Sequence, residues 1–419
     1  MIEIVFIVSA AVLLFQIYFW INRARELVEA SLGGIPEIDP RKIAELPESP
    51  PLISVIVPAH NEEMTIRDCL SSVLEQDYPN YELILVDDRS EDRTAAIAEE
   101  LARSKRPFKI VRVAELPAGW TGKCHALDRG IVHANGEWLA FLDADSCLHK
   151  SALRQCYIEA VKARVNMITL TPKFILKTFW EKALQPTFAS MSCILFPITQ
   201  INVQSSPVAS ANGMFYLISR RAYDAIDGHR DVRNLAVEDI GIGKRVKASG
   251  LGLLFANGRR VLRTRMYTNF HEIINGWARI LSASMNYRVS TALKYLVLHV
   301  LMSFPLLVFA LYFYIPTAQW LWPNTWFVPL FVLSTLAIIV SGLYCKQIGA
   351  SVSLFRWVFL GNLLLIWVFL VIVKRILMKD ALQWRGTTYQ TSKYQPTCLN
   401  PVNSRIYTGT PRSVLEEIN

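Results

Sequence analysis

The sequence predicts an α/β protein with a Rossmann-like sheet and apolar, membrane-type segments at both ends of the chain. Continuous apolar runs such as LISVIVPA, at residues 52–59, are typical of parallel strands that are covered on both faces. These runs alternate with helical segments, and this alternation is typical of a doubly wound sheet with right-handed crossovers. In addition, 52% of the 419 residues are hydrophobic and the mean hydropathy is +0.27, which is high for a soluble protein.

The elements of the sheet are expected after a polar linker rich in turn residues. Asn61 near an N-cap position starts the first helix, and Ser90 followed by Asp92 starts the second. The expected strands are 52–59, 81–88, 108–113 and 137–145, and the expected helices are 61–76, 90–104 and 123–134. Ligands bind beyond the carboxyl ends of the strands in such sheets, so the polar groups at those ends are site candidates.

The N-terminal segment is expected to anchor the chain in a membrane. Residues 4–22 carry no charge and are long enough to cross a bilayer, for which about 20 residues are needed. Arg23 and Arg25 follow at once, no basic residue precedes the run, and no small-residue cleavage site follows it, which favours a retained anchor over a cleaved signal peptide. The positive-inside rule then places the next domain in the cytoplasm.

A second apolar region lies near the C-terminus, where residues 295–345 contain no charged side chain. Candidate spans are about 296–315, 326–344 and 355–377. Three spans would place the basic residues after 373 outside, against the positive-inside rule, so two or three are expected. The predicted organisation is an anchor at 1–25, a linker at 26–50, a cytoplasmic catalytic domain at 51–270, an interfacial segment at 271–294, a transmembrane region at 295–378 and a tail at 379–419.

Cysteine usage and charge narrow the classes of partner. The seven cysteines are scattered without a CxxC pair, which favours reduced thiols over a zinc site or a disulfide framework. The net charge of +9 suits anionic lipid headgroups or a phosphate-bearing substrate. No dense basic run occurs, which argues against nucleic acid as a partner. The sequence does not indicate an oligomeric state.

Asp143 and Asp145 form the most informative acidic pair, in LAFLDADS at the end of an expected strand. Two carboxylates this close raise each other's pKa unless a cation holds them. A hard divalent metal bound to a diphosphate would do so through one or two carboxylates. The alternative is a turn capped by aspartates, but the position after the fourth strand favours the metal site.

Other polar residues stand at the same predicted edge. Asp87 and Asp88 end a strand and could recognise a nucleotide base or ribose, or only form an Asx-turn. Glu62 could meet the nucleotide or only complement a helix dipole. Lys123, in GWTGKCHAL at a helix start, could contact a diphosphate, although the P-loop spacing is absent and a solvated lysine is the alternative.

Glu238 and Asp239 precede a helix further along the chain. They could complement its dipole, or one of them could act as the general base for an acceptor hydroxyl. Asn212, Gly213 and His229 lie between the two acidic sites in sequence and could shape an acceptor pocket. A lone histidine such as His229 is, however, more often a structural residue.

Taken together, these motifs resemble the inverting family 2 glycosyltransferases of the GT-A fold. The resemblance covers about residues 50–290 and is carried, in order, by VPAHNEE, LILVDDRSEDRT, GWTGKCHALDRG, EWLAFLDADS, ANGMFYLISRRAYDAIDGH and VEDIGIGKRVKASG. Within the family, GWTGK, residues 265–282 and QWRGTTY at 383–389 resemble membrane-bound enzymes that glycosylate polyisoprenoid-type lipids, including carotenoid- and hopanoid-associated enzymes.

The resemblance implies a nucleotide-sugar donor and a membrane lipid acceptor. It implies that Pro58, Glu62, Asp87 and Asp88 hold the uridine, with Lys123 near the diphosphate.

For the reaction centre, the resemblance implies that Asp143 and Asp145 form the DxD motif, with Asp145 the direct ligand of Mg²⁺ or Mn²⁺. Asp239 matches the catalytic base and Glu238 supports it.

One departure from the family concerns polymer synthesis. The QxxRW motif of processive polysaccharide synthases is missing, and the nearest elements are Trp277 and Arg279 in NGWARIL and residues 383–385. We therefore expect Trp277 to be an interfacial anchor or a pocket wall. A processive synthase remains the enzymatic alternative, and a catalytically silent membrane scaffold the non-enzymatic one.

Overall fold

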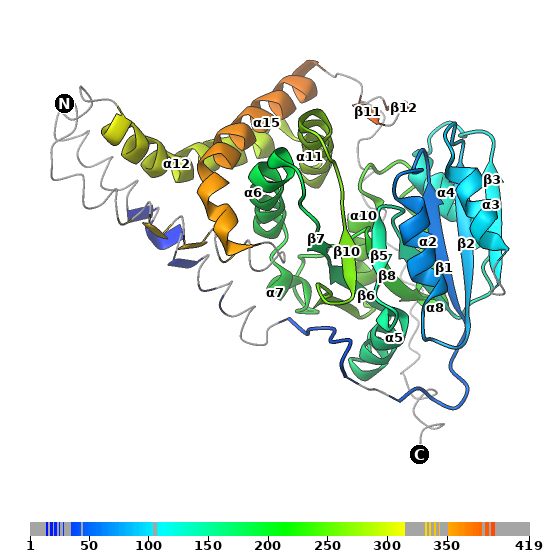
Figure 1. The fold of residues 1–419 in the computed structure, drawn as a ribbon. Helices are drawn as coiled ribbons and strands as arrows, with labels where there is room; N and C mark the ends of the chain where they lie inside the picture. The colour runs from blue at the N-terminus through cyan, green and yellow to red at the C-terminus, as the bar shows by residue number, and fades with distance from the viewer. Residues whose placement is uncertain are drawn as a thin grey trace.

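The computed structural model describes residues 35–103 without 43–44, 107–314 and 351–378, together with scattered positions that include 382–384 and 387–389. Its centre is a seven-stranded sheet of order β3-β2-β1-β4-β8-β6-β9 (Figure 1). The strands are β1 (Ile53–Ala59), β2 (Tyr81–Asp88), β3 (Phe108–Val113), β4 (Trp138–Leu142), β6 (Met167–Thr171), β8 (Phe215–Ser219) and β9 (Leu253–Asn257).

The predicted α/β, Rossmann-like sheet is confirmed, with local differences. The first two helices begin at Ile66 and Thr94, several residues after Asn61 and Ser90, so these two residues are not the N-caps that the sequence predicts. Strands β2 and β3 have the predicted bounds, and β1, β2, β3 and β4 pair in parallel. The strand expected to reach residue 145 ends at Leu142, so Asp143 and Asp145 lie in the loop that follows β4. Strand β8 runs antiparallel to both β4 and β6, which makes the sheet mixed.

Helices cover both faces of the sheet, which explains the continuous apolar runs. Val55 and Val57 of β1 face one core cluster, which includes residues of α2 (Ile66–Leu74), α3 (Thr94–Ala102) and α5 (Ala152–Lys162). Ile56 faces the other cluster, with α4 (Gly122–Ile131), α8 (Arg220–Ala225) and α10 (Glu238–Ala248). Helix α4 packs closely, because a Cβ at Gly130 would lie 2.7 Å from Ile56 Cγ2.

A small sheet, β5-β10-β7, stands beside the carboxyl end of β4. It contains β5 (Ser146–Leu148), β10 (Leu262–Thr264) and β7 (Lys173–Phe174), and β10 pairs antiparallel with β5. The structure also contains two short helices, α7 (Ile198–Ile201) and α9 (Gly228–Asp231), and the 3-10 helix η3 (Val352–Trp357). Two short strands, β11 (Leu382–Trp384) and β12 (Thr387–Tyr389), pair with each other. The sheet attaches the loop of Asp145 to a segment more than 100 residues later in the chain.

A third apolar cluster lies beside the sheet domain and is formed mainly by three long helices. These are α6 (Phe179–Leu195), α11 (Phe270–Ser284) and α15 (Val358–Met378). Helix α15 crosses α6 at close range, because a Cβ at Gly361 would lie 2.3 Å from Thr187 Oγ1. Helix α12 (Val289–Tyr314) also packs against α15 (Figure 1).

One helix in the described part of the chain, Leu360–Met378, is long and apolar enough to cross a membrane. It corresponds to the expected span at 355–377. Residues 289–301 form a shorter apolar helical stretch. The expected anchor at 1–25, the span at 326–344 and the tail at 379–419 lie outside the described residues, apart from scattered positions.

Candidate active site

A cavity of about 1000 Å³ opens at the carboxyl ends of β1 and β4 and extends to α6 and α11. It brings together residues as far apart in the sequence as Pro58 and Tyr287. The predicted site residues that line it are Pro58, Glu62, Asp88, Lys123, Asp143, Asp145, Asn212, Gly213, Glu238, Asp239, Trp277 and Arg279. Asp87 and His229 do not line it.

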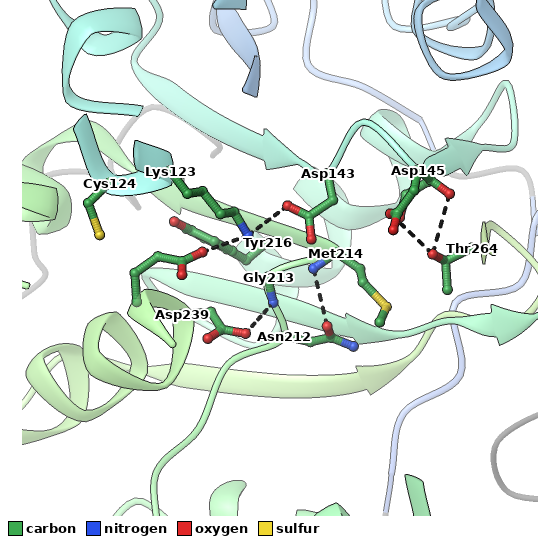
Figure 2. Close-up of polar contacts among 12 residues, drawn as sticks. Lys123, Cys124, Asp143, Asp145, Asn212, Gly213, Met214, Tyr216, Asp239 and Thr264 are labelled. Atoms are coloured by element: carbon green, nitrogen blue, oxygen red, sulfur yellow. Dashed lines mark hydrogen bonds and ion pairs between the residues drawn. The ribbon is translucent and has the colours of Figure 1, made fainter. Parts of the chain in front are cut away.

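Lys123 stands at the centre of the acidic part of the cavity. Thr121 caps the N-terminus of α4 by accepting a hydrogen bond from Cys124 N, which places Lys123 in the first turn. Lys123 Nζ lies 2.7 Å from Asp143 Oδ1 (Figure 2). It also lies 2.6 Å from Glu238 Oε1. The lysine thus joins the end of β4 to the start of α10.

The carboxylate of Asp239, which also belongs to this cluster, is held by backbone N–H groups. Its Oδ2 accepts a hydrogen bond of 2.6 Å from Gly213 N (Figure 2). Its Oδ1 accepts one from Ile240 N. Asn212 supports this loop, because its Oδ1 accepts from Met214 N at 3.2 Å. A Cβ at position 213 would lie 3.0 Å from Lys123 Nζ and 3.1 Å from Asp239 Oδ2, so a larger residue there would displace one of these two side chains by a few tenths of an ångström.

The charges in this cluster shift each other's protonation. Burial raises the pKa of Asp143 to about 6, although Lys123 opposes the shift. Burial and then the Glu238 carboxylate raise the pKa of Asp239 to about 7. Burial also acts against ionised Glu238 and Lys123, but their ion pair outweighs it, so the pKa of Glu238 is lowered and that of Lys123 is raised. Asp239 therefore has the acid–base range expected of a general base near neutral pH.

Asp145 is fixed by hydroxyl groups of the small sheet. Its Oδ1 accepts a hydrogen bond from Thr264 Oγ1 at 3.3 Å (Figure 2). The same atom accepts one from Ser146 Oγ at 3.2 Å. Within the described chain, no group of three His, Cys, Asp or Glu side chains could hold a metal alone. A hard divalent ion completed by substrate phosphates needs only one or two carboxylates, so Asp143 and Asp145 fit Mg²⁺ or Mn²⁺.

The end of the cavity beside β1 and β2 carries several of the residues that the sequence analysis expects to contact a nucleotide. Asp88 forms an ion pair with Arg89, whose Nε lies 2.9 Å from Asp88 Oδ1, and both line the cavity. Glu62 Oε2 accepts a hydrogen bond of 3.0 Å from Thr65 Oγ1. Asp87 accepts from Ser90 N at 3.3 Å behind the cavity wall, which is the turn role that the sequence left open as the alternative.

His229 lies in the protein core and does not line the cavity. It is fully buried, and the hydroxyl groups of Tyr216 and Tyr223 contact its Nε2 and Nδ1 at 3.0 and 2.7 Å. Burial lowers the pKa of His229 to about 3, so the ring is neutral. The structure therefore corrects the placement of His229 in the pocket, because both of its ring nitrogens are engaged in the core.

Trp277 and Arg279 of α11 do reach the cavity, in supporting roles. Trp277 is 4% exposed, and its Nε1 donates to Gln185 Oε1 of α6 at 2.8 Å. Arg279 Nη1 donates to the carbonyl oxygen of Ala236 at 2.8 Å, and its Nη2 to Tyr267 Oη at 3.3 Å. Arg279 thus fixes the loop that leads to Glu238 and Asp239.

Sequence reasoning missed several residues that complete the site. Thr264 is the last residue of β10, and Arg265 and Tyr267 lie in the segment that follows and line the cavity. Tyr267 has a positive φ of 50°, and its ring occupies the space next to Gly276, where a Cβ would lie 2.2 Å from Tyr267 Cζ. Strained backbone of this kind is concentrated at functional sites. The only sequence signal was the resemblance of residues 265–282 to lipid-modifying enzymes.

Comparison with known proteins supports the same family. Residues 54–227 match the family "Glycosyl transferase family 2". Curated relatives include 4,4'-diaponeurosporenoate glycosyltransferases from strains of Staphylococcus aureus, which are 27% identical over 233 residues. The match covers 55% of this chain, and the chain spans 60% of the length of these relatives.

Solved structures that are similar include the mannosyltransferase PcManGT from Pyrobaculum calidifontis in complex with GDP-Man and Mn²⁺. That match has 16% identity and a TM-score of 0.48, and covers 90% of this chain and 98% of that one. Glucosyl-3-phosphoglycerate synthase from Mycobacterium tuberculosis is 21% identical, with a TM-score of 0.37 and coverage of 56% and 78%. Residues 54–227 of this chain form a glycosyltransferase domain of family 2, as the sequence motifs predict.

Proposed function

We propose that the protein is an inverting glycosyltransferase that moves a sugar from a nucleoside diphosphate sugar, in the first instance a UDP-sugar, to a lipid acceptor at the cytoplasmic face of a membrane. The observation that carries this proposal is the single cavity in which Lys123 joins Asp143 to Glu238 while Asp239 faces the same space. The groups that would bind the donor and the base that would act on the acceptor therefore line the same cavity.

The donor would lie along the carboxyl ends of β1, β2 and β4. Pro58, Glu62 and Asp88 would contact the nucleoside, with Asp87 supporting the turn behind them. Asp145, together with Asp143, would hold Mg²⁺ or Mn²⁺, which when bound stabilises the charge of the departing diphosphate. The nucleoside is thus expected beside β1 and the sugar towards α10 and α11.

The acceptor would occupy the other end of the cavity, where the lining becomes apolar. This end is formed by side chains of α6, α7 and α11 and the chain between them: Ala189, Cys193, Phe196, Ile198, Ile201 and Ile280. Such a lining suits a hydrocarbon chain. Helix α15, which could cross a membrane, packs against α6 and α11. The relatives' name specifies a carotenoid acid, which is also an apolar acceptor.

The reaction would place the acceptor oxygen next to Asp239. Asp239 accepts the hydroxyl proton, and the oxygen attacks the anomeric carbon from the side opposite the diphosphate, which inverts that carbon. The hydrogen bond from Gly213 N keeps the carboxylate of Asp239 in one orientation. Lys123 pairs with Asp143 and Glu238 and so holds the donor loop and the base loop together.

The test is transfer of radiolabelled sugar from a nucleoside diphosphate sugar to extracted membrane lipids. Asp239→Asn and Asp145→Asn should each lower the transfer rate by at least about 100-fold, because they remove the base and a cation ligand. Asp224→Asn, at an exposed position outside the cavity, is the matched control. Full transfer by both site variants would refute the assignments. A labelled product longer than one or two sugars would favour a processive synthase.

A further inference from the structure

Arg265 lies beside the acidic pair, and none of the roles described so far uses its charge. It follows β10 directly, and its backbone N donates a hydrogen bond of 3.3 Å to the carbonyl oxygen of Asp145. Its side chain is 32% exposed and lines the cavity. Figure 2 shows the preceding residue, Thr264, directed at Asp145. Arg265 is therefore attached to the loop that carries the proposed cation ligand.

A buried carboxylate fixes the orientation of this guanidinium. Glu181, near the start of α6, is fully buried, and its Oε1 accepts from Arg265 Nε at 3.0 Å, with Nη2 also 3.0 Å away. Its Oε2 accepts from the backbone N of Thr178 at 2.6 Å, in a capping box. One edge of the guanidinium is thus held by Glu181. Within the described part of the chain, Nη1 has no protein partner.

Lys123 and Arg265 differ in how far protein carboxylates neutralise their charge. Lys123 already faces the carboxylates of Asp143 and Glu238, with Asp239 nearby, so its charge is matched by protein groups. Among the residues that the structure describes, Arg265 is paired with one carboxylate, that of Glu181. A guanidinium held on one edge offers its remaining N–H groups in a fixed plane, which is the geometry that binds phosphate oxygens.

We propose that Arg265 binds the donor diphosphate, through the phosphate distal to the nucleoside. This inference rests on the proposed glycosyltransferase function and adds a substrate-binding residue to it. The distal phosphate is assigned because Arg265 reaches the cavity from the α6 side of Asp145, whereas the nucleoside residues belong to β1 and β2. Glu181 is then the residue that positions Arg265.

The experiment compares two nucleotides on the full-length protein in detergent. Calorimetric Kd values for UDP and UMP, with Mn²⁺, are measured for the wild type and for Arg265→Ala. Loss of a charge-assisted contact should weaken UDP binding by about 10- to 100-fold. UMP, which lacks the distal phosphate, should bind within about threefold of the wild-type value. Unchanged UDP binding, or equal losses for both nucleotides, would overturn the proposal.

Three further variants separate binding from folding. Arg265→Lys keeps the positive charge but loses the planar, forked guanidinium group, and it should give an intermediate Kd for UDP. Glu181→Gln should weaken UDP binding and leave UMP binding unchanged, as expected of a positioning residue. Arg263→Ala removes an exposed arginine of β10 and should change neither Kd. If the wild type binds neither UDP nor GDP, the proposed function itself fails; if it binds UDP and Arg265→Ala binds equally well, only this inference fails.

Discussion

The protonation state of Asp239 makes the pH profile of sugar transfer a sharp test of the proposed base. Burial, then Glu238, raises the pKa of Asp239 to about 7. The base acts in its deprotonated form, so kcat/KM should rise as pH increases through about 7. A single group with this pKa is about 9% deprotonated at pH 6 and about 91% at pH 8, so kcat/KM should increase about tenfold over that interval.

Glu238→Gln tests the electrostatic origin of that profile. The substitution removes one group that raises the pKa of Asp239 and leaves Lys123 with one carboxylate partner fewer, so the acidic limb should move to lower pH. A limb about one pH unit lower would reduce the increase between pH 6 and pH 8 to about twofold.

Initial rates would be measured with saturating Mn²⁺, so that Asp143, whose pKa is raised to about 6, stays ionised. Asp224→Asn controls for the loss of a carboxylate outside the cavity and should keep the wild-type profile. A wild-type kcat/KM that is flat between pH 6 and pH 8, or a limb that moves to higher pH in Glu238→Gln, would contradict the assignment of Asp239.

Three substitutions test the packing around the site. Gly213→Ala places a Cβ 3.0 Å from Lys123 Nζ and should lower kcat at least about tenfold with little change in Tm. An unaltered kcat would show that the contact between residue 213 and Lys123 does not matter for transfer. Thr264→Val removes a hydroxyl from the Asp145 carboxylate and should weaken Mn²⁺-dependent UDP binding about tenfold, which Thr264→Ser should restore. Gly361→Val should destabilise the chain by about 1–3 kcal/mol, visible as a lower Tm in detergent, whereas Leu363→Val at an exposed position should not.

Local sequence patterns were sufficient to predict the first half of the sheet. The runs at 81–88 and 108–113 are bounded by turn residues, and the strands begin and end there. The direction of β8 could not be predicted in the same way. A strand covered on both faces gives one apolar run whether its neighbours are parallel or antiparallel, so FYLIS carries no signal of direction.

The acidic centre was predictable because each of its residues belongs to a short motif, even though Lys123 and Glu238 are 115 positions apart. Arg265 and Glu181 were not, because an arginine after a three-residue strand and a glutamate in a capping box have no local pattern that indicates a ligand. His229 shows the opposite error, since its position between two motifs suggested a pocket, and only the tertiary fold places two tyrosine hydroxyls on its ring.

The close crossing of α15 and α6 at Gly361 has a consequence for where the protein could act. Helix α6 carries Glu181 in its first turn and contributes to the cavity wall, so α15 packs directly against an element of the candidate site. If Leu360–Met378, about 28 Å long at 1.5 Å per residue, lies across a bilayer, its depth sets the height of Asp239 above the lipid headgroups. The protein would then select acceptors whose reactive oxygen lies at the same height above the membrane as Asp239. In that case the rate of sugar transfer would depend on the thickness of the bilayer.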